Sequence, residues 1–332
     1  MEYDIVVVGA GPGGSSAAKS AAQNGARVLL LEKRQEIGAP KRCGEAAPNI
    51  EELKKLGIKI FPQMICNEIR GYSLFSPKGI NVKVIWDSIV GCMLERKMFD
   101  KFLAIQASQA GAHIMVKARA TGLLRDDGKI VGVKVNHLGE ELNVRAKVVI
   151  AADGIEAMVA RWAGLNIKTL RDTTSNIQFE MGGVKLEDPS LLEFYFGREI
   201  APGGYAWVFP KSEDVANVGL GLRGGKTVAL QYLKKFIQSK ESLRKGAIIE
   251  INAGSTPVGG PIEKTVADNL MVVGDAAGHI NPVTGGGVYN AVLCGTIAGE
   301  VAAKAVVDGN TSKERLYEYE QRWKQALYDN FD

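Results

Sequence analysis

Over the first 32 positions an apolar run is followed by a stretch of small residues and then by a second apolar run, a pattern that predicts a strand, a helix and a second strand. Residues 3–8 end in a continuous apolar run, which is typical of a strand buried on both faces. Residues 15–24 are small and compatible with a helix, and Gly25 ends it. Residues 27–31 form a second apolar run that closes at Glu32. We therefore expect a βαβ unit at the N-terminus.

Similar buried strands return later in the chain, which indicates a discontinuous domain. They are predicted at 148–152, before Asp153-Gly154, and at 269–273, before Gly274-Asp275 and a long helical stretch. A helix is expected at 96–110, and strands within 116–135 flank a turn at 126–129. From about 166 to 262 the strands shorten and alternate, including 205–210 and 215–222, with a helix near 227–239. This pattern of short, alternating strands predicts an inserted antiparallel sheet.

These patterns define two predicted domains and a C-terminal segment. The dinucleotide-binding domain comprises residues 1–61, 94–163 and 264–310, and the inserted substrate domain comprises 62–93 and 164–263. Residues 311–332 are expected to begin a helical region that continues in longer relatives. There Leu316, Tyr319, Trp323 and Leu327 form one helical stripe, and we expect this stripe to lack its packing partner.

Composition and charge narrow the class of protein. The 332 residues are 46% hydrophobic and 23% charged, with a net charge of +4 and no basic stripe interleaved with aromatics, so nucleic acid is not an expected partner. No apolar run of about 18 residues and no signal peptide is visible, so we expect a cytoplasmic protein, with attachment to the cytoplasmic face of the membrane left open. Four dispersed cysteines predict neither a metal site nor disulfides.

The glycine loop after the first strand carries the clearest chemistry. Gly9 permits a tight turn, Gly11 lets a pyrophosphate approach the helix N-terminus, and Gly14 allows close packing of helix on strand. Pro12 lies at the expected helix start, and Glu32 can accept hydrogen bonds from ribose hydroxyls. The Rossmann context makes a dinucleotide site the favoured interpretation over an empty turn.

The distant Gly274-Asp275 pair favours FAD over NAD, because an extended FAD needs a second strand end for its ribityl and flavin portion. Asp275 would accept a hydrogen bond there, although an ordinary helix cap is the alternative. Gly285, Gly286 and Gly287 can direct backbone N–H groups toward the flavin. His279 follows this motif, and for it a structural role is favoured over a catalytic one.

A second glycine repeat, Gly219 to Gly224, could suggest a nicotinamide site. Its strand alternates in the manner of an antiparallel sheet, so we do not expect a second nucleotide there. Tyr205, Trp207 and Phe209 share one face of the neighbouring strand, and Gly219 and Gly221 share one face of theirs. Packing in a hydrophobic core is the ordinary interpretation. However, a row of aromatic side chains beside a strand face made of glycines predicts a cavity for a long apolar ligand.

Taken together, these motifs resemble the geranylgeranyl reductase family. The resemblance is carried by the N-terminal glycine loop, Pro40-x-x-Cys43-Gly44, Arg96 at a helix start, Asp153-Gly154, Gly274-Asp275 and Tyr205-x-Trp207-x-Phe209-Pro210 followed by Gly219-x-Gly221. It covers essentially the whole chain. The fold it implies is α/β, with a discontinuous Rossmann-type FAD-binding domain and an inserted antiparallel β-sheet substrate domain, as in p-hydroxybenzoate hydroxylase.

The resemblance also implies an activity and further site residues. The family is implied to use reduced FAD, supplied with electrons by NADPH or ferredoxin, to saturate C=C bonds of isoprenoid chains in archaeal ether lipids. Cys43 is implied to lie close to the flavin and Arg96 to help hold the dinucleotide. The remaining cofactor-binding candidates are Lys33, Arg42, Gly44 and Asp153.

The implied chemistry is demanding because an isolated alkene has no carbonyl to accept charge. Protonation must accompany hydride transfer, and the faces of Trp207 or Tyr205 could stabilise the positive carbon. Cys43, Tyr205 and an ordered water are the candidate proton donors, so Cys43, Tyr205 and Trp207 are the catalytic candidates. The alternatives are a flavin monooxygenase or halogenase of the same fold, and a non-catalytic flavin or lipid carrier.

Overall fold

The computed structural model describes residues 1–223 and 228–328, so Gly224 of the second glycine repeat lies outside the described residues. The chain forms two compact units, one of Met1–Ala39, Asp100–Asp172 and Pro257–Asp332, the other of Pro40–Phe99 and Thr173–Thr256. Residues 40–61 therefore belong to the second unit, whereas we had predicted them in the dinucleotide domain. The reason is backbone pairing, because Ala46–Pro48 (β3) pairs with Gly91–Leu94 (β7) of that unit.

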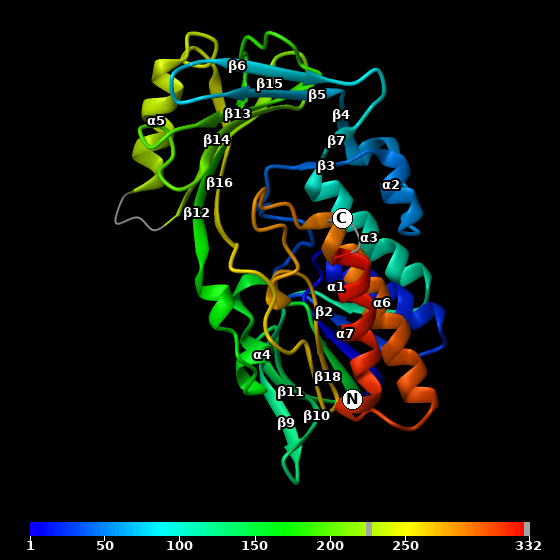
Figure 1. Cartoon of the computed structure of the whole chain (residues 1–332). Helices are drawn as coiled ribbons and strands as arrows, with labels where there is room; N and C mark the ends of the chain where they lie inside the picture. The colour runs from blue at the N-terminus through cyan, green and yellow to red at the C-terminus, as the bar shows by residue number, and fades with distance from the viewer. Residues whose placement is uncertain (224–227, 329–332) are drawn as a thin grey trace. The chain divides into compact units, whose positions relative to one another are not determined.

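The first unit is built on an eight-stranded sheet whose central strands are parallel (Figure 1). In sheet order its strands are β17 (Val266–Ala267), β18 (Leu270–Val272), β11 (Glu140–Ala151), β1 (Glu2–Val8), β2 (Val28–Leu31) and β8 (His113–Met115), while β10 (Lys129–His137) pairs with β11 and β9 (Ala118–Asp126). The predicted strands and the N-terminal βαβ unit are confirmed.

The helices of this unit are α1 (Pro12–Gln23), α4 (Met158–Trp162), α6 (Val288–Val307), α7 (Lys313–Tyr328) and the part of α3 (Arg96–Gln109) from Asp100 on. Short 3-10 turns complete it, namely η2 (Gly154–Glu156), η3 (Lys168–Arg171) and η4 (Gly274–Ala277). Alternate strand residues point to opposite faces. Ile5 and Val7 pack on the α1, α6 and α7 side, while Val6 and Val8 pack toward β9, β10 and α4.

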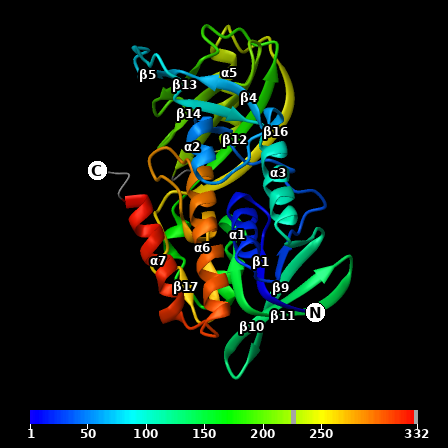
Figure 2. The same ribbon diagram turned by 90° about the vertical axis from the view of Figure 1, so that its right-hand side faces the viewer.

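The C-terminal stripe has a packing partner, so our expectation of an unpartnered stripe was wrong. Leu316, Tyr319, Trp323 and Leu327 are all buried in the same core as α1 and α6. Figure 2 shows α6 lying between α1 and α7. The Tyr319 hydroxyl also donates to the Val272 carbonyl at 2.8 Å, which fixes α7 on the sheet.

Helix α6 is apolar along most of its length, although Glu300 and Lys304 interrupt the apolar run. Within the described part of the chain it is the one helix long and apolar enough to cross a membrane, with a mean hydropathy of 1.3 over 20 residues. Most of it is buried, and its Ile297, Ala298 and Val301 lie in the core of the first unit. Its apolar character is therefore that of a core helix.

The second unit contains a seven-stranded and a three-stranded sheet. The larger one runs β16 (Ala247–Pro257), β12 (Thr173–Gly182), β15 (Val215–Arg223), β14 (Tyr205–Pro210), β13 (Leu191–Phe196), β5 (Gly71–Phe75) and β6 (Asn81–Ile85). The smaller one runs β3, β7 and β4 (Ile65–Ile69), and α2 (Ile50–Lys55), η1 (Pro62–Met64) and α5 (Ala229–Ser239) complete the unit. β12, β15, β14 and β13 pair antiparallel as predicted, while β13 pairs parallel with β5.

The larger sheet has two chemically different faces. On one face Val208, Val218 and Phe179 pack with Leu233 and Phe236 of α5 in a filled core. Because neighbouring residues on a strand point to opposite faces, Trp207 and Gly219, which are paired across β14 and β15, lie on the other face. We call this second face the aromatic face.

Candidate functional site

The glycine loop between β1 and α1 has the geometry of a phosphate cradle. Gly9 has φ of +104°, and a Cβ there would lie 2.3 Å from the Ala152 carbonyl oxygen. A Cβ on Gly14 would lie 1.8 Å from the Gly9 carbonyl oxygen. At Gly11 a Cβ would meet no described atom within 4 Å. Gly9 and Gly14 are therefore required by close packing, whereas Gly11 leaves an open approach to the helix.

Helix α1 begins at Pro12 with Gly11 as its N-cap, and no side chain among the described residues caps it. Its first N–H groups and the positive end of the helix dipole therefore remain available to an anion. Glu32 ends β2, and its two carboxylate oxygens accept from the backbone N–H groups of Ala10, at 3.1 Å, and Arg34, at 2.9 Å. Glu32 thus fixes the loop as well as being a ribose-binding candidate.

Two other cofactor candidates have structural partners. Lys33 pairs with Glu156 at 2.6 Å on the surface. Asp153 is buried, and one of its oxygens accepts from the Val159 N–H at 3.0 Å while the other has no partner within the described chain. Burial raises the pKa of Asp153 although backbone N–H groups at Val159 and Met158 oppose it. An orphaned buried oxygen at a strand end fits a polar cofactor.

The second strand end supports the same cofactor. Gly274 and Asp275 lie in η4, directly after β18, and Gly285 has φ of +73° in the loop that follows. Gly287 is the N-cap of α6, and the structure places no described side chain as a cap there. A second uncapped helix N-terminus preceded by glycines fits the electron-rich edge of a flavin.

His279 is a structural residue by its surroundings. It is fully buried, its ring centroid lies 4.5 Å from that of Trp323, and neither ring nitrogen has a hydrogen-bond partner among the described residues. Burial lowers the pKa of His279 to about 3. The imidazole is therefore neutral at physiological pH and packs as an apolar ring, which agrees with the favoured interpretation.

The loop carrying Cys43 is part of the second unit. The Cys43 sulfur accepts from the Glu45 N–H at 3.2 Å, and the Cys43 carbonyl accepts from the Gln178 side chain at 3.1 Å. A Cβ on Gly44 would lie 3.2 Å from the Phe209 ring. Glu45 has φ of 73°, a left-handed conformation that costs a non-glycine residue free energy unless its surroundings impose it.

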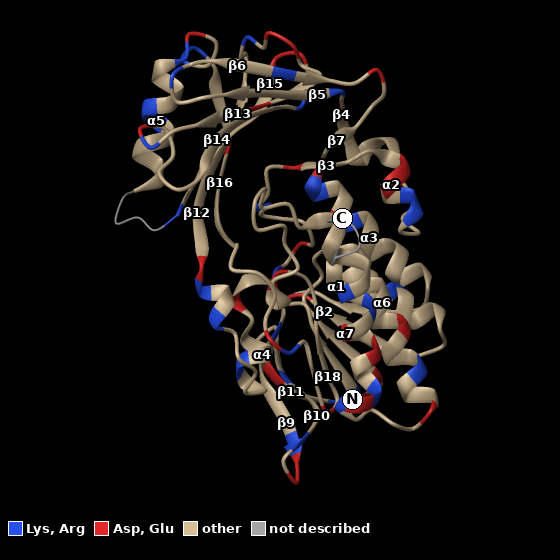
Figure 3. Cartoon of the chain, viewed as in Figure 1, with Lys and Arg blue, Asp and Glu red and all other residues tan. Residues whose placement is uncertain are grey.

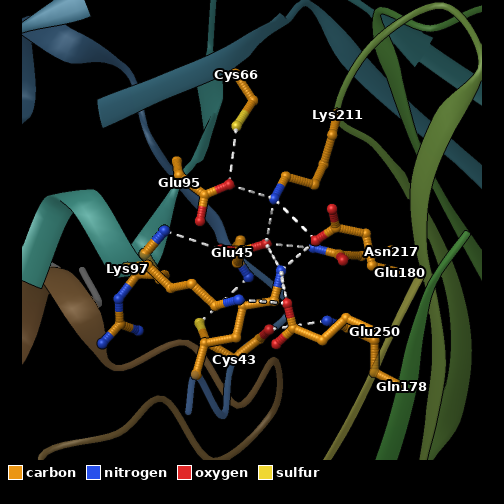
Figure 4. A network of polar contacts seen from close by, with 12 residues as sticks. Cys43, Glu45, Cys66, Glu95, Lys97, Gln178, Glu180, Lys211, Asn217 and Glu250 are labelled. Carbon is orange, nitrogen blue, oxygen red and sulfur yellow. Dashed lines mark hydrogen bonds and ion pairs between the residues drawn. The ribbon is translucent and has the colours of Figure 1, made fainter. Parts of the chain in front are cut away.

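Those surroundings are a buried network of charged side chains, drawn in Figure 4. The Glu45 carboxylate is fully buried and lies 2.9 Å from Lys41 Nζ and 3.0 Å from Lys211 Nζ. Asn217 donates to it at 2.8 Å, and the Arg96 N–H donates to its other oxygen at 2.8 Å. Burial would raise the pKa of Glu45, but Lys211 and Lys41 hold it below its usual range.

The network extends outward from the two lysines. Glu180 pairs with Lys41, and it lies 3.1 Å from Lys211, while Glu95 lies 2.8 Å from Lys211. Burial would lower the pKa of Lys211, but Glu45, Glu95 and Glu180 raise it above its usual range. Lys211 therefore stays charged, and the loop from 40 to 45 is anchored to Glu180 on β12 and to Lys211 directly after β14.

The aromatic face carries the three predicted cavity residues in one row. The ring centroids of Tyr205 and Trp207 are 5.8 Å apart, and those of Trp207 and Phe209 are 5.9 Å apart. Trp207 and Phe209 are buried, and Tyr205 is half-buried. Burial and the neighbouring Cys43 raise the pKa of Tyr205 to about 12, so its hydroxyl stays protonated.

Gly219 and Gly221 do not border an open cavity, although we predicted that they would. A Cβ on Gly219 would lie 2.5 Å from Trp207 Cζ2, and one on Gly221 would lie 2.5 Å from Asn176 Oδ1. The space above each glycine is therefore filled by a side chain of the same sheet. Gly219 acts by letting the Trp207 indole lie flat on β15.

Gln178 is a site residue that the sequence did not single out. Its side chain is buried, accepts from the Trp207 indole N–H at 2.9 Å and donates to the Cys43 carbonyl at 3.1 Å. In the sequence Gln178 and Glu180 alternate with the apolar residues of 177–181, so the pattern does not mark Gln178 as buried. Arg42 lies beside Gly254, where a Cβ would come 3.5 Å from its side chain, and its role as a cofactor ligand stays a prediction.

No group of three or more His, Cys, Asp and Glu side chains positioned for a metal ion occurs in residues 1–223 and 228–328. The fold and the two strand-end glycine sites define the class of protein. The chain is an FAD-binding flavoprotein, and the FAD binding domain model matches residues 2–213.

Comparisons with known proteins specify the family. The model for the geranylgeranyl reductase catalytic domain matches residues 172–256, which is almost the same segment as Thr173–Thr256 of the second unit. The chain is 53% identical over 331 residues to a digeranylgeranylglycerophospholipid reductase of Methanocaldococcus jannaschii, covering 98% of this chain and 83% of the relative. It is 48% identical to digeranylgeranylglycerophospholipid reductase 1 of Methanothermobacter thermautotrophicus, covering 99% and 84%.

Solved structures agree. A geranylgeranyl bacteriochlorophyll reductase-like protein from Thermoplasma acidophilum superposes with a TM-score of 0.92 at 40% identity, covering 98% of this chain and 84% of that one. A flavin-dependent brominase variant superposes with a TM-score of 0.78 at 20% identity, covering 98% and 90%, which shows the shared fold alone. The chain belongs to the geranylgeranyl reductase family and is an FAD-dependent reductase.

Proposed function

We propose that this chain saturates the C=C bonds of geranylgeranyl chains in archaeal ether phospholipids. The observation that carries the proposal is the aromatic row Tyr205, Trp207 and Phe209, because Trp207 is joined through Gln178 to the loop of Cys43. The names of the relatives in Methanocaldococcus jannaschii and Methanothermobacter thermautotrophicus support a phospholipid substrate.

In the proposed reaction the alkene π bond breaks and two C–H bonds form. Bound reduced FAD would supply the hydride for one alkene carbon, and NADPH and ferredoxin are the candidates for the external electron donor. A proton reaches the other carbon, so positive charge develops next to the aromatic row. An aromatic face stabilises such charge by roughly 0.5–2 kcal/mol.

The residues of the second unit have separate roles in this proposal. Trp207 and Tyr205 stabilise charge, and Phe209 and Trp207 exclude water from the alkene. Cys43 and Tyr205 are the candidate proton donors from the chain itself, and both keep their place through hydrogen bonds and burial described above. The glycine cradle, with Arg42 and Arg96 as further candidates, binds the cofactor.

Anaerobic flavin spectroscopy tests the proposal. Chemically reduced, FAD-loaded protein is mixed without oxygen with unsaturated archaeal phospholipid, and the return of the oxidised flavin spectrum is followed. We expect reoxidation with this lipid and none with the fully saturated lipid. Reoxidation that requires oxygen, with either lipid, would indicate a monooxygenase or halogenase and refute the proposal. Re-reduction by NADPH or by reduced ferredoxin then identifies the electron donor.

A further inference from the structure

Strand β6 presents an unusually apolar edge of the seven-stranded sheet. Ile80, just before it, is 64% exposed, Val82 is 53% exposed, and Trp86, just after it, is 41% exposed. An apolar edge strand with unpaired backbone groups favours association and is seldom left open in a protein without a partner. We call Ile80, Val82, Val84 and Trp86 the β6 patch.

The β6 patch belongs to the aromatic face. In the sheet register Val84 pairs with Tyr72 of β5, and Tyr72 in turn pairs with Leu192 of β13. Paired residues point to the same face, and Leu192 lies in the buried cluster with Trp207 and Phe209. Val82 and Val84 are therefore exposed members of the face whose interior carries the aromatic row.

Aromatic contacts connect the patch to the row without interruption. The ring centroid of Trp86 lies 5.6 Å from that of Tyr72, and Tyr72 lies 6.0 Å from Phe194. Phe194 lies 5.4 Å from Tyr205, which adjoins Trp207. A lipid chain that moves along this path stays on apolar surface from the edge strand to the row.

The charges around the patch suit an anionic surface. Residues 70–90 contain Arg70, Lys78 and Lys83 but only one acidic residue, Asp87. Lys83 pairs with Glu187 at 2.7 Å and points to the face opposite Val82 and Val84, so Arg70 and Lys78 supply the positive charge near the patch. Most of the β6 ribbon carries no charge, as Figure 3 shows. Aliphatic side chains, a tryptophan and nearby basic residues together are typical of segments that rest on a phospholipid surface.

We propose that the β6 patch docks on the surface of an anionic phospholipid bilayer. The inference rests on the proposed function, because the substrate of that function is a membrane lipid whose chain must leave the bilayer. Lys83 lies at the centre of β6, and it argues against self-association through this edge. In a symmetric antiparallel pair of β6 strands centred on Lys83, the two Lys83 side chains would face each other, and like charges directly opposite are destabilising.

Vesicle flotation with the full chain tests the docking surface. The probe is vesicles of phosphatidylglycerol and phosphatidylcholine, with pure phosphatidylcholine as the uncharged comparison. The test variant is I80S/V82S, and the matched control is I248S/I251S on β16, the opposite edge, where Ile248 is 52% and Ile251 63% exposed. Changes at exposed sites leave the fold intact in both variants.

We expect I80S/V82S to bind anionic vesicles at least tenfold more weakly than the unaltered protein, and the control to bind within about twofold of it. Equal binding by all three proteins, or equal loss in both variants, would overturn the proposal. The proposal would also be overturned if the unaltered protein did not bind vesicles but formed a dimer that the I80S/V82S substitutions dissociate.

Activity separates this inference from the proposed function. With substrate embedded in vesicles, I80S/V82S should turn over at least tenfold more slowly than the unaltered protein. With the same lipid dispersed in detergent, the two rates should agree within about threefold. Loss of both rates in the unaltered protein would instead refute the proposed function, and loss of both in I80S/V82S alone would overturn docking as the role of the patch.

Discussion

The indole N–H of Trp207 donates to the side-chain oxygen of Gln178 at 2.9 Å, and the same amide donates to the Cys43 carbonyl at 3.1 Å. One buried side chain therefore holds two of the three catalytic candidates, Trp207 by its ring and Cys43 by its backbone. Trp207 is also held from below by Gly219, where any Cβ would collide with the ring. The aromatic row is thus fixed before any ligand binds.

Replacing Gln178 with leucine should leave the Trp207 N–H and the Cys43 carbonyl without their partner. A buried unsatisfied group costs about 1–3 kcal/mol, so we expect a lower free energy of unfolding, measured by denaturant titration. We also expect kcat for lipid reduction to fall by more than tenfold, since Trp207 loses its orientation. Gln178→Glu keeps the acceptor for Trp207 and should recover part of kcat. An unchanged kcat in Gln178→Leu would remove the positioning role.

Replacing Gly219 with alanine should displace the Trp207 ring. The added Cβ would lie 2.5 Å from Cζ2 and 2.8 Å from the Ile177 carbonyl oxygen, so overpacking should cost about 1–3 kcal/mol. Thermal unfolding and Trp fluorescence measure the two effects. Gly122→Ala on β9 is the control, because its nearest neighbour would lie 3.9 Å away. Similar behaviour of both variants would contradict the packing described for Trp207.

Replacing Lys211 with methionine should leave Glu45 with one of its two cations and Glu95 without its 2.8 Å partner. Breaking a buried ion pair costs about 3–5 kcal/mol, which denaturant titration can measure. Lys83→Met, which removes an exposed pair with Glu187, should cause no measurable change. A Lys211→Met protein as stable as the Lys83→Met control would show that the network does not hold the Cys43 loop.

The acid stability of the first unit should depend on His279. Burial lowers its pKa to about 3, whereas the unfolded chain has the usual value near 6.5. The unfolded state therefore binds a proton first, and stability present above pH 6.5 is lost as the pH falls toward 3. The loss is worth up to roughly 4–5 kcal/mol at about 1.4 kcal/mol per pKa unit.

A His279→Leu variant checks this pH dependence. Its free energy of unfolding should fall less steeply than that of the unaltered protein between pH 6.5 and 4, while the two should be similar at pH 7. If His279→Leu had the same slope as the unaltered protein, His279 would not be buried as described.

The local patterns of the sequence predicted the parts of the fold that local rules determine. The βαβ unit was predicted because apolar runs and glycine spacing within about thirty residues define it. The antiparallel nature of 215–223 followed from its period of two. The apolar stripe of α7 was also predicted, but a stripe does not indicate which element packs against it. In the structure it packs in the same core as α6.

The buried network was missed for a physical reason. Lys41 and Glu45 come from one loop, Glu180 from β12 and Lys211 from the turn directly after β14, so only the sheet register brings them together. Charged residues are usually exposed, and nothing in their spacing marked these as buried. Gln178 was missed in the same way, since its two partners lie on distant segments.

In the proposed function, the aromatic row of this flavoprotein holds an isoprenoid chain for reduction. The direct measurement is the mass of unsaturated archaeal phospholipid after anaerobic incubation with chemically reduced, FAD-loaded protein. We expect the mass of the isoprenoid chains to rise by successive pairs of hydrogens, and we expect Trp207→Ala to slow this gain at least tenfold. Lipid that binds but returns with its mass unchanged, from protein that retains reduced FAD, would contradict the account and indicate a carrier.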